Sequence, residues 1–371
     1  MGAEQQTTAV RAAKEVRTAK DTAVRTAKDT AVRTGRDAAG GATAVAHPNI
    51  ALIKYWGKRD ERLILPRTDS LSMTLDIFPT TTRVQLAPDA GHDGVTLGGK
   101  PAEGDARQRI VAFLDLVREL AGVGHPAVVE TENTVPTGAG LASSASGFAA
   151  LAMAAAAAYG LDLDVTALSR LARRGSGSAS RSLFGDFVVW HAGREDGTDE
   201  EADLSSYAEP VPAGPLDPAL VVAVVNAGPK DVSSRAAMRR TVDTSPLYEP
   251  WALSSKDDLA DMRVALGRGD LEAVGEIAER NALGMHATML AARPAVRYLS
   301  PATLTVLDSV LQLRRDGVAA YATMDAGPNV KVLCRNADAD RVADVVRGAA
   351  QGGAIHIARP GPGARLLNED G

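Results

Sequence analysis

The pattern of apolar and polar positions from Ala44 onward predicts a protein that mixes strands and helices. Three apolar runs rich in β-branched residues are typical of strands, namely TTTRVQL, FVVW and ALVVAVVNAG. Elsewhere apolar residues recur every three or four positions, as they do on one face of a helix. We expect helices over 105–120, 144–159, 165–174, 253–266, 271–290, 303–315 and 337–349. The pattern therefore predicts an α+β or α/β fold.

Two segments break this pattern and suggest how the chain is organised. Residues 1–43 contain no aromatic residue and repeat the octet TAKDTAVR in tandem, so we expect a low-complexity extension that is disordered or forms a frayed helix. The region 192–218 is rich in Gly, Pro, Asp and Glu, which is typical of a loop near a domain division. We place that division near Val225, which gives an N-terminal domain over 44–225 and a C-terminal domain over 226–371.

Composition narrows the class of protein. The 371 residues are 45% hydrophobic, enough to bury the cores of one large or two ordinary domains. The net charge of −5 offers no general attraction to nucleic acid or to an anionic membrane. The single cysteine, Cys334, lies in the apolar run VKVLC, so we expect a buried thiol and a reducing compartment. No run reaches the roughly 18 apolar residues of a membrane span, and no export signal is evident, so we expect a cytoplasmic protein.

A run of small residues between a predicted strand and a predicted helix is typical of a phosphate-binding loop. The segment VPTGAGLASSASG contains Gly138 and Gly140, which permit close backbone approach, and serines whose hydroxyls can bind an anion. The following helix adds unpaired N–H groups at its start. The spacing matches neither the Walker pattern nor the dinucleotide fingerprint. The alternative is a small-residue turn that caps a buried alanine helix.

Three further segments each combine a charged residue with a strand or turn. Lys54 interrupts an apolar run, so it either reaches the surface or is held in a site against an anion. Arg181 lies among the serines of RRGSGSASRS, where its guanidinium suits a carboxylate or phosphate, although a polar helix end would also explain it. Asp325 precedes the turn of MDAGPN, and a turn-capping role is the alternative. Together the four segments indicate a polyanionic substrate.

These segments resemble those of a known superfamily. IALIKYWGKRD, VPTGAGLASSASG and TMDAGPNVKVL are similar to the three motifs of the galactokinase, homoserine kinase, mevalonate kinase and phosphomevalonate kinase (GHMP) superfamily. More narrowly, NIALIKYWGKRD, RRGSGSASRS, VSSR, MHATML and MDAGPNVKVL resemble diphosphomevalonate decarboxylases, in order, over residues 44–356. The resemblance implies a GHMP-kinase-like two-domain α/β sandwich, with the active site in a cleft between the domains, and a homodimer.

The resemblance also implies a reaction, the conversion of (R)-5-diphosphomevalonate and ATP to isopentenyl diphosphate, ADP, phosphate and CO2 in the mevalonate pathway of isoprenoid biosynthesis. Hydroxide is a poor leaving group, so the tertiary alcohol is first converted to a phosphate ester by ATP. Loss of phosphate then builds positive charge on the tertiary carbon, and the electrons of the breaking C–CO2 bond quench it. Because no carbonyl electron sink is needed, no pyridoxal or thiamine cofactor is expected. The cofactors that the resemblance implies are ATP and Mg2+.

Site residues follow from the same resemblance. It implies that Asp325 faces the C3 hydroxyl as base or orienting group, that Lys54 keeps this carboxylate ionised, and that Arg181 grips the C1 carboxylate. Around the substrate and its diphosphate it implies Tyr55, Lys58, Ser176, Ser178, Ser234 and Arg235. For ATP it implies Thr131 near adenine and the loop residues Gly138, Gly140, Leu141, Ala142, Ser143 and Ser144, with Ser144 also a candidate Mg2+ ligand.

Some features depart from the family pattern and leave alternatives open. Asp186 stands where the family usually has glycine, so we expect its side chain to point to solvent, and Asp69 has no assigned role. His286 is expected to be a packed residue rather than a metal ligand. The alternatives are a superfamily kinase that stops at the phosphate ester, a decarboxylase of the monophosphate, and a non-catalytic binding protein. The sequences GLASSA and IKYWGKRD favour the diphosphate decarboxylase over a kinase.

Overall fold

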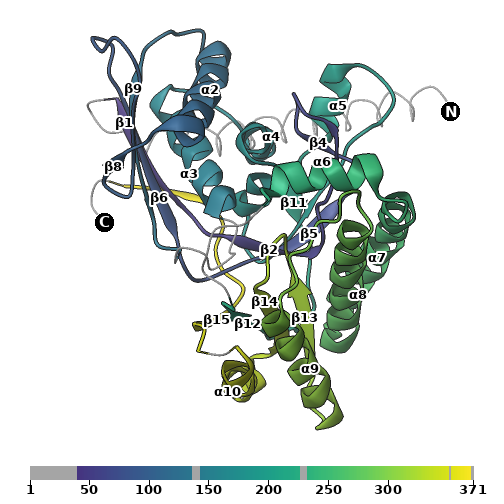
Figure 1. Cartoon of the computed structure of the whole chain (residues 1–371). Coiled ribbons are helices and arrows are strands. Elements are labelled where there is room, and N and C mark those ends of the chain that lie inside the picture. The colour runs from purple at the N-terminus through teal and green to yellow at the C-terminus, as the bar shows by residue number, and fades with distance from the viewer. Residues whose placement is uncertain (1–39, 136–142, 226–231, 351, 369–371) are drawn as a thin grey trace, which may run out of the picture.

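The computed structural model describes residues 40–135, 143–225, 232–350 and 352–368 (Figure 1). Its largest sheet is mainly antiparallel, and only β7 and β9 run parallel. Strand β1 already begins at Gly41 and pairs with β6, so the ordered fold starts before the end that we predicted for the extension at residue 43. In order across the sheet the strands are β16 (Arg365–Leu367), β1 (Gly41–Ala46), β6 (Thr80–Leu86), β9 (Ala127–Asn133), β7 (Gly94–Leu97) and β8 (Lys100–Pro101).

Two four-stranded sheets and a short hairpin complete the strands of the described chain. The first has the order β11 (Ala208–Pro210), β10 (Phe187–Trp190), β5 (Ser70–Thr74) and β2 (Asn49–Ile53). The second has the order β13 (Ala320–Met324), β14 (Val330–Arg335), β12 (Pro218–Ala223) and β15 (Ile355–Ala358). The hairpin joins β3 (Lys58–Asp60) to β4 (Leu65–Pro66).

Helices cover these sheets in two groups that come from different parts of the chain. The alanine-rich α3 packs directly on β1 and β6, because its small side chains let the helix backbone approach the strands closely. The first group is α2 (Gly104–Ala121), α3 (Ser143–Ala158) and α4 (Val165–Gly175), followed by the 3-10 helix η2 (Gly177–Leu183). The second is α6 (Ser234–Thr244), α7 (Tyr248–Arg268), α8 (Leu271–Leu290), α9 (Pro301–Arg315) and α10 (Ala339–Ala349), with the 3-10 turn η3 (Asn336–Asp338).

A shared core joins the two parts of the chain through β2. All five residues of β2 are buried, and Ile50 and Leu52 pack in one cluster with Leu220 of β12 and Met262 of α7. Because such a core excludes water on both sides, the end of β2 is fixed between the two helical groups. The residue that follows β2 is therefore held at their junction.

The seven predicted helices are confirmed, with α7 beginning five residues earlier than expected, at Tyr248. The region 192–218 was wrongly predicted to be a loop, since it contains α5 (Asp199–Ser205) and β11. Both elements are short and bury few side chains, so their sequences show little periodicity of apolar residues. Strand β12 precedes the predicted domain division near Val225 but pairs with β14 and β15, which favours a division before Pro218. The predictions for 1–39 lie outside the described residues.

Further expectations concern single residues and membrane spans. The Cys334 thiol is free and buried, as predicted, and burial raises its pKa to about 12. Asp69, which had no assigned role, accepts a hydrogen bond from the backbone N–H of Ala192 at 2.6 Å and so ties the end of β10 to the start of β5. No helix in the described part of the chain has the length and hydropathy that crossing a bilayer requires.

Asp186 is exposed to solvent, as predicted, and its backbone explains why a glycine suits this position. Its φ angle is 55°, in the left-handed region that disfavours residues with a Cβ atom. Backbone hydrogen bonds on both sides fix this geometry, from the Asp186 N–H to Gly361 at 3.0 Å and from the Thr74 N–H to Asp186 at 2.8 Å. The chain therefore holds an aspartate in a conformation better suited to glycine.

We predict that Asp186→Gly raises the free energy of unfolding by about 0.5–1 kcal/mol, because it relieves this left-handed strain. Chemical denaturation measures the change. Asp89→Gly is the matched control: Asp89 is also exposed in a turn but has no positive φ, so its replacement gains nothing and loses backbone entropy. Equal destabilisation by both substitutions would contradict the prediction.

Candidate active site

The centre of the candidate site is one carboxylate between two ammonium groups. Asp325 directly follows β13, Lys54 directly follows β2, and Lys331 lies within β14. Lys54 Nζ donates to Asp325 Oδ1 at 2.9 Å, and Lys331 Nζ donates to Oδ2 at 3.1 Å. Both lysines are about 1% exposed, whereas the Asp325 side chain keeps 30% of its surface accessible. The carboxylate is thus the accessible member of a buried trio.

The charges of this trio favour an ionised carboxylate. Burial by itself raises the pKa of the Asp325 carboxyl, but the ammonium groups of Lys331 and Lys54 outweigh that effect and hold the pKa well below its usual range. Burial lowers the pKa of the Lys54 ammonium, and the opposing attraction of Asp325 does not fully restore it. At neutral pH Asp325 is therefore an acceptor of hydrogen bonds and a weak base.

Helix α8 holds both sides of the Lys54–Asp325 pair from the C-terminal part of the chain. Asn281 Oδ1 accepts the backbone N–H of Lys54 at 2.8 Å, and its amide donates to Asp258 at 2.9 Å. One turn further along, His286 Nε2 donates to the backbone carbonyl of Asp325 at 3.2 Å. Burial lowers the pKa of His286 to about 4, so this imidazole is neutral at pH 7. His286 is thus packed, as predicted, and holds the backbone of Asp325 in place.

Arg181 is a second buried cation, held by neutral groups. It lies in η2, is 2% exposed, and donates to Ser70 Oγ at 2.7 Å and to Ser72 Oγ at 2.9 Å. Asn49 Oδ1 accepts from Arg181 Nε at 3.3 Å and from its Nη2 at 3.2 Å. Burial lowers the pKa of Arg181 to about 10, so it stays protonated at neutral pH. Within the described ranges no ion pair joins it to a carboxylate, a charge arrangement that suits an incoming anion.

Tyr55, Ser176 at the start of η2 and Ser178 within it belong to the same part of the fold as Arg181. The Tyr55 ring packs edge-on against Trp190 with centroids 4.8 Å apart, and its hydroxyl is buried without a hydrogen-bond partner among the residues described. Ser176 Oγ lies 3.3 Å from Ser144 Oγ of α3, so the start of α3 meets the start of η2. The half-buried Ser178 accepts the Asn49 amide at its backbone carbonyl, at 3.0 Å. These contacts connect the predicted phosphate loop to the predicted substrate site.

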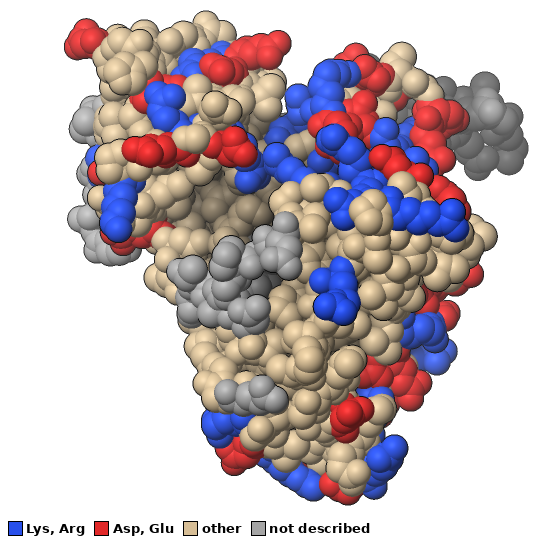
Figure 2. All heavy atoms as spheres, in the orientation of Figure 1, with Lys and Arg blue, Asp and Glu red and all other residues tan. Residues whose placement is uncertain are grey.

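The remaining predicted substrate residues lie further out. Lys58 pairs with Glu61 at 2.5 Å, in the β3–β4 hairpin. Ser234 begins α6, and Arg235 is exposed on its first turn. The Arg235 charge is close enough to oppose the rise in the pKa of Tyr55 that burial causes. Figure 2 shows a hollow bordered by Lys and Arg side chains on the side of the molecule that carries α6.

The predicted ATP residues are only partly described. Gly138, Gly140, Leu141 and Ala142 lie outside the described residues. Ser143 and Ser144 form the first turn of α3, where Ser143 is exposed and Ser144 is half-buried. Thr131 lies on β9 with its hydroxyl 3.1 Å from that of Thr82.

Sequence reasoning missed Lys331 and the hydrogen-bonding residues Asn49 and Asn281. Lys331 interrupts the apolar run of β14 in the same way as Lys54 interrupts the run that includes β2, so the signal that identified one lysine could have identified the other. Asn49 lies at the start of an apolar strand and Asn281 within a helix, and neither position carries a distinctive local pattern. Their roles follow only from the tertiary contacts.

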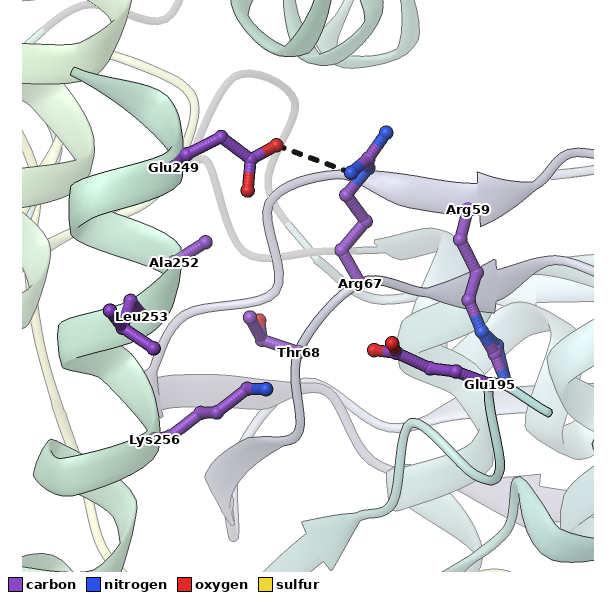
Figure 3. A pocket seen from close by; sticks show the side chains of 8 residues that line it. All are labelled: Arg59, Arg67, Thr68, Glu195, Glu249, Ala252, Leu253 and Lys256. Carbon is purple, nitrogen blue, oxygen red and sulfur yellow. Dashed lines mark hydrogen bonds and ion pairs between the residues drawn. The ribbon is translucent and has the colours of Figure 1, made fainter.

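A separate cavity of about 330 Å³ lies between the β3–β4 hairpin and α7 (Figure 3). Three basic side chains and two acidic ones line it, and Arg67 pairs with Glu249 at 3.2 Å. These charges nearly cancel, so the cavity is less suited to a polyanion than the Asp325 and Arg181 region. No predicted site residue is among its lining, which consists of Arg59, Arg67, Thr68, Glu195, Glu249, Ala252, Leu253 and Lys256.

Comparison with known proteins gives matches over most of the chain. Residues 46–202 match the model of the diphosphomevalonate decarboxylase-like N-terminal domain, and residues 220–356 match that of the mevalonate 5-diphosphate decarboxylase C-terminal domain. The diphosphomevalonate decarboxylase of Aspergillus fumigatus is 38% identical over 326 residues, which cover 82% of this chain and 80% of that protein. The phosphomevalonate decarboxylase of Haloferax volcanii is 36% identical over 314 residues, covering 82% and 91%.

Solved structures agree with these matches. A structure of MDDEF in complex with MVAPP, AMPPCP and magnesium has a TM-score of 0.83 and 44% identity, and the match covers 88% of this chain and 99% of that one. The mevalonate diphosphate decarboxylase of Staphylococcus aureus also has a TM-score of 0.83, with 39% identity and coverage of 88% and 98%. The expected GHMP-kinase-like two-domain α/β architecture is confirmed by these likenesses. By sequence and by fold, this chain belongs to the diphosphomevalonate decarboxylase family.

Proposed function

We propose that the protein decarboxylates (R)-5-diphosphomevalonate with ATP, which yields isopentenyl diphosphate, ADP, phosphate and CO2 in the mevalonate pathway. The observation that carries this proposal is that one site contains both an accessible, ionised Asp325 and a buried Arg181. In the described chain, Arg181 forms no ion pair with any carboxylate. One group accepts a hydrogen bond from an alcohol, and the other receives a carboxylate. A 3-hydroxy acid has both groups, with the single carbon C2 between the carboxylate carbon and the carbon that carries the hydroxyl.

In the first step Asp325 orients the C3 hydroxyl, whose oxygen attacks the terminal phosphoryl group of ATP. ADP leaves, and the hydroxyl proton passes to the Asp325 carboxylate as the ester bond forms. The carboxylate is fixed by Lys54 and Lys331, so the alcohol meets an acceptor already in position. The lysine charges also favour the negative charge that develops on the transferred phosphoryl group. Because these cations hold the pKa of Asp325 low, orientation and electrostatic attraction are the larger part of its role.

In the second step Arg181 holds the C1 carboxylate while phosphate leaves C3. Ser70, Ser72 and Asn49 fix the plane of the guanidinium group. Its remaining N–H groups can then bind both oxygens of the carboxylate, which fixes the orientation of the C–CO2 bond. The ionised Asp325 stabilises positive charge that develops on C3. The breaking C–CO2 bond supplies the electrons of the new double bond.

The start of α3 suits the phosphates of ATP and an associated Mg2+ ion. The hydroxyls of Ser143 and Ser144 are hard oxygen donors at a helix N-terminus, the environment that phosphate oxygens and Mg2+ favour. When bound, Mg2+ would neutralise part of the negative charge on the phosphates of ATP. Ser144 would hold it together with the nucleotide, and Ser144 also contacts Ser176 at 3.3 Å, next to the substrate site.

We propose that the diphosphate tail binds near Lys58 of the β3–β4 hairpin and near Ser234 and Arg235 at the start of α6. A cytoplasmic location and a homodimer are likewise proposed from the family resemblance. For the dimer, α8 and α9 expose Leu283, Leu290, Leu304 and Leu311, which could be covered by a second copy of the chain. Sedimentation of the purified protein measures the subunit number, and a monomer at micromolar concentration would contradict the dimer.

The proposed activity is tested by counting CO2 and ADP with (R)-5-diphosphomevalonate, ATP and Mg2+, beside parallel assays with the monophosphate and with mevalonate. We expect equal amounts of CO2 and ADP from the diphosphate. ADP without CO2 would indicate a kinase, and CO2 from the monophosphate alone would move the enzyme to that substrate. The absence of both products would contradict catalysis altogether.

We predict that Asp325→Asn lowers kcat by about a hundredfold to ten-thousandfold, the range for loss of a positioned proton acceptor. The amide keeps the side-chain shape but loses the charge that the two lysines and the C3 cation require. ATP binding, measured by nucleotide fluorescence, should stay nearly unchanged. Asp261→Asn is the control, since Asp261 is exposed on α7 and should leave kcat unaltered. A kcat for Asp325→Asn within threefold of the original would contradict the assigned role.

We predict that Arg181→Lys lowers kcat/KM by about ten- to a hundredfold, because an ammonium cannot form two parallel hydrogen bonds to a carboxylate. Both KM for the substrate and the CO2 release rate should be affected, and steady-state assays with single-turnover CO2 release separate them. The exposed Arg341 of α10 provides the control substitution, Arg341→Lys. If the two variants matched in kcat/KM, Arg181 would not bind the carboxylate.

A further inference from the structure

One lysine is enough to neutralise the charge of Asp325, but two lysines contact its carboxylate. Lys54 alone pairs with the carboxylate at 2.9 Å and also donates to the backbone carbonyl of Ala51 at 2.7 Å. Lys331 adds a further ammonium on the other oxygen at 3.1 Å, so the trio carries a net charge of +1 when all three groups are ionised. Such an excess positive charge next to an accessible carboxylate favours an anion in the cleft.

The position of Lys331 makes a purely structural explanation weak. It lies in β14 between Val330 and Val332, and the three residues are buried. At such a position an apolar side chain packs without the cost of desolvating an ammonium group, and replacing buried charges with apolar residues is often neutral or stabilising. The β14 backbone pairs with β12 and β13 through main-chain hydrogen bonds, which do not require a lysine. The charge therefore points to a role in the site.

The geometry of the two contacts suggests what that role is. With one ammonium, the carboxylate could rotate about its Cβ–Cγ bond and exchange its two oxygens. With Lys54 on Oδ1 and Lys331 on Oδ2, the plane of the carboxylate is fixed from both sides. The accessible lone pairs are then fixed in one direction, on the exposed side of the carboxylate.

We propose that Lys331 is a positioning residue of the reaction centre, which fixes the Asp325 carboxylate in its orientation and keeps it ionised for the C3 hydroxyl. This inference rests on the proposed decarboxylase activity and deepens it. It does not assign Lys331 a contact with the substrate. In this proposal, each oxygen of the Asp325 carboxylate is held by a different buried lysine.

The pH dependence follows from the groups that face Asp325. These are Lys54 after β2, Lys331 on β14, the neutral His286 on α8 and, at longer range, Arg181 on η2. Activity requires ionised Asp325, so it is lost as the pH falls through the pKa of that carboxyl. Without the Lys331 charge, burial is opposed by one direct ammonium instead of two, and the pKa rises. The original protein should therefore show no acid limb of kcat/KM between about pH 4.5 and 8, whereas in the neutral variants the limb should move up into that range.

The experiment compares Lys331→Met and Lys331→Gln with the original protein in kcat and KM over pH 4.5 to about 8. Both variants remove the charge, and glutamine keeps a hydrogen-bond donor, so it also serves if the methionine variant fails to fold. Lys331→Arg keeps the charge and should keep the acid limb low. The exposed Lys256 of α7 provides the control substitution, Lys256→Met. We expect kcat to fall about tenfold or more at pH 7 in the neutral variants, with KM for ATP within threefold.

A second readout does not depend on turnover. Carbon-13 NMR of protein labelled in its aspartate carboxyl groups, with Asp325→Asn to assign the signal, follows the ionisation of Asp325 directly. We expect this signal to titrate at higher pH in Lys331→Met than in the original protein. If the signal and the acid limb are both unmoved, the proposal for Lys331 is wrong. If the original protein releases no CO2, the proposed function is wrong, and the NMR result still decides whether Lys331 holds Asp325 ionised.

Discussion

The structure depends on one electrostatic arrangement, a carboxylate held between two buried lysines where the two parts of the chain meet. A lysine without a partner would not stay charged in such a place, because desolvation of an ammonium group is costly. Asp325 pairs with both Lys54 and Lys331, which leaves one positive charge in excess, and its side chain remains 30% accessible. The cost of burying these charges is offset only if they remain together. The trio therefore constrains the ends of β2 and β13 and the middle of β14 at once.

The fold provides those positions through strands that contribute little chemistry of their own. The apolar β2 is buried along its whole length and leads directly into Lys54, while Asn281 of α8 fixes the Lys54 backbone. On the other side of the site, η2 places Arg181 against hydroxyls from β5. In the proposed reaction, these two fixed charges of opposite sign bind the alcohol and the carboxylate of the substrate.

Much of this could be predicted from the sequence, but only where the pattern is local. The longer helices follow from apolar periodicity, and Lys54 stands out because it interrupts an apolar run. The roles expected of Arg181 and Asp325 came from the family motifs that contain them. The helix α6 and the elements α5 and β11 were missed, because they bury few apolar side chains and leave no clear period. Asn49 and Asn281 were missed for a different reason, since a buried amide gains its role only from partners far away in the sequence. Asp186 was singled out by its departure from glycine, but the φ of 55° that explains it required the structure.

The account's central claim is that Asp325 and Arg181 hold two neighbouring groups of one substrate. A crystal structure with (R)-5-diphosphomevalonate bound tests it most directly. We expect the C3 hydroxyl within hydrogen-bond distance of an Asp325 carboxylate oxygen, with Lys54 and Lys331 still on Oδ1 and Oδ2. We also expect both oxygens of the C1 carboxylate on the Arg181 guanidinium. A substrate carboxylate bound away from Arg181, or a C3 hydroxyl that faces another residue, would contradict the account.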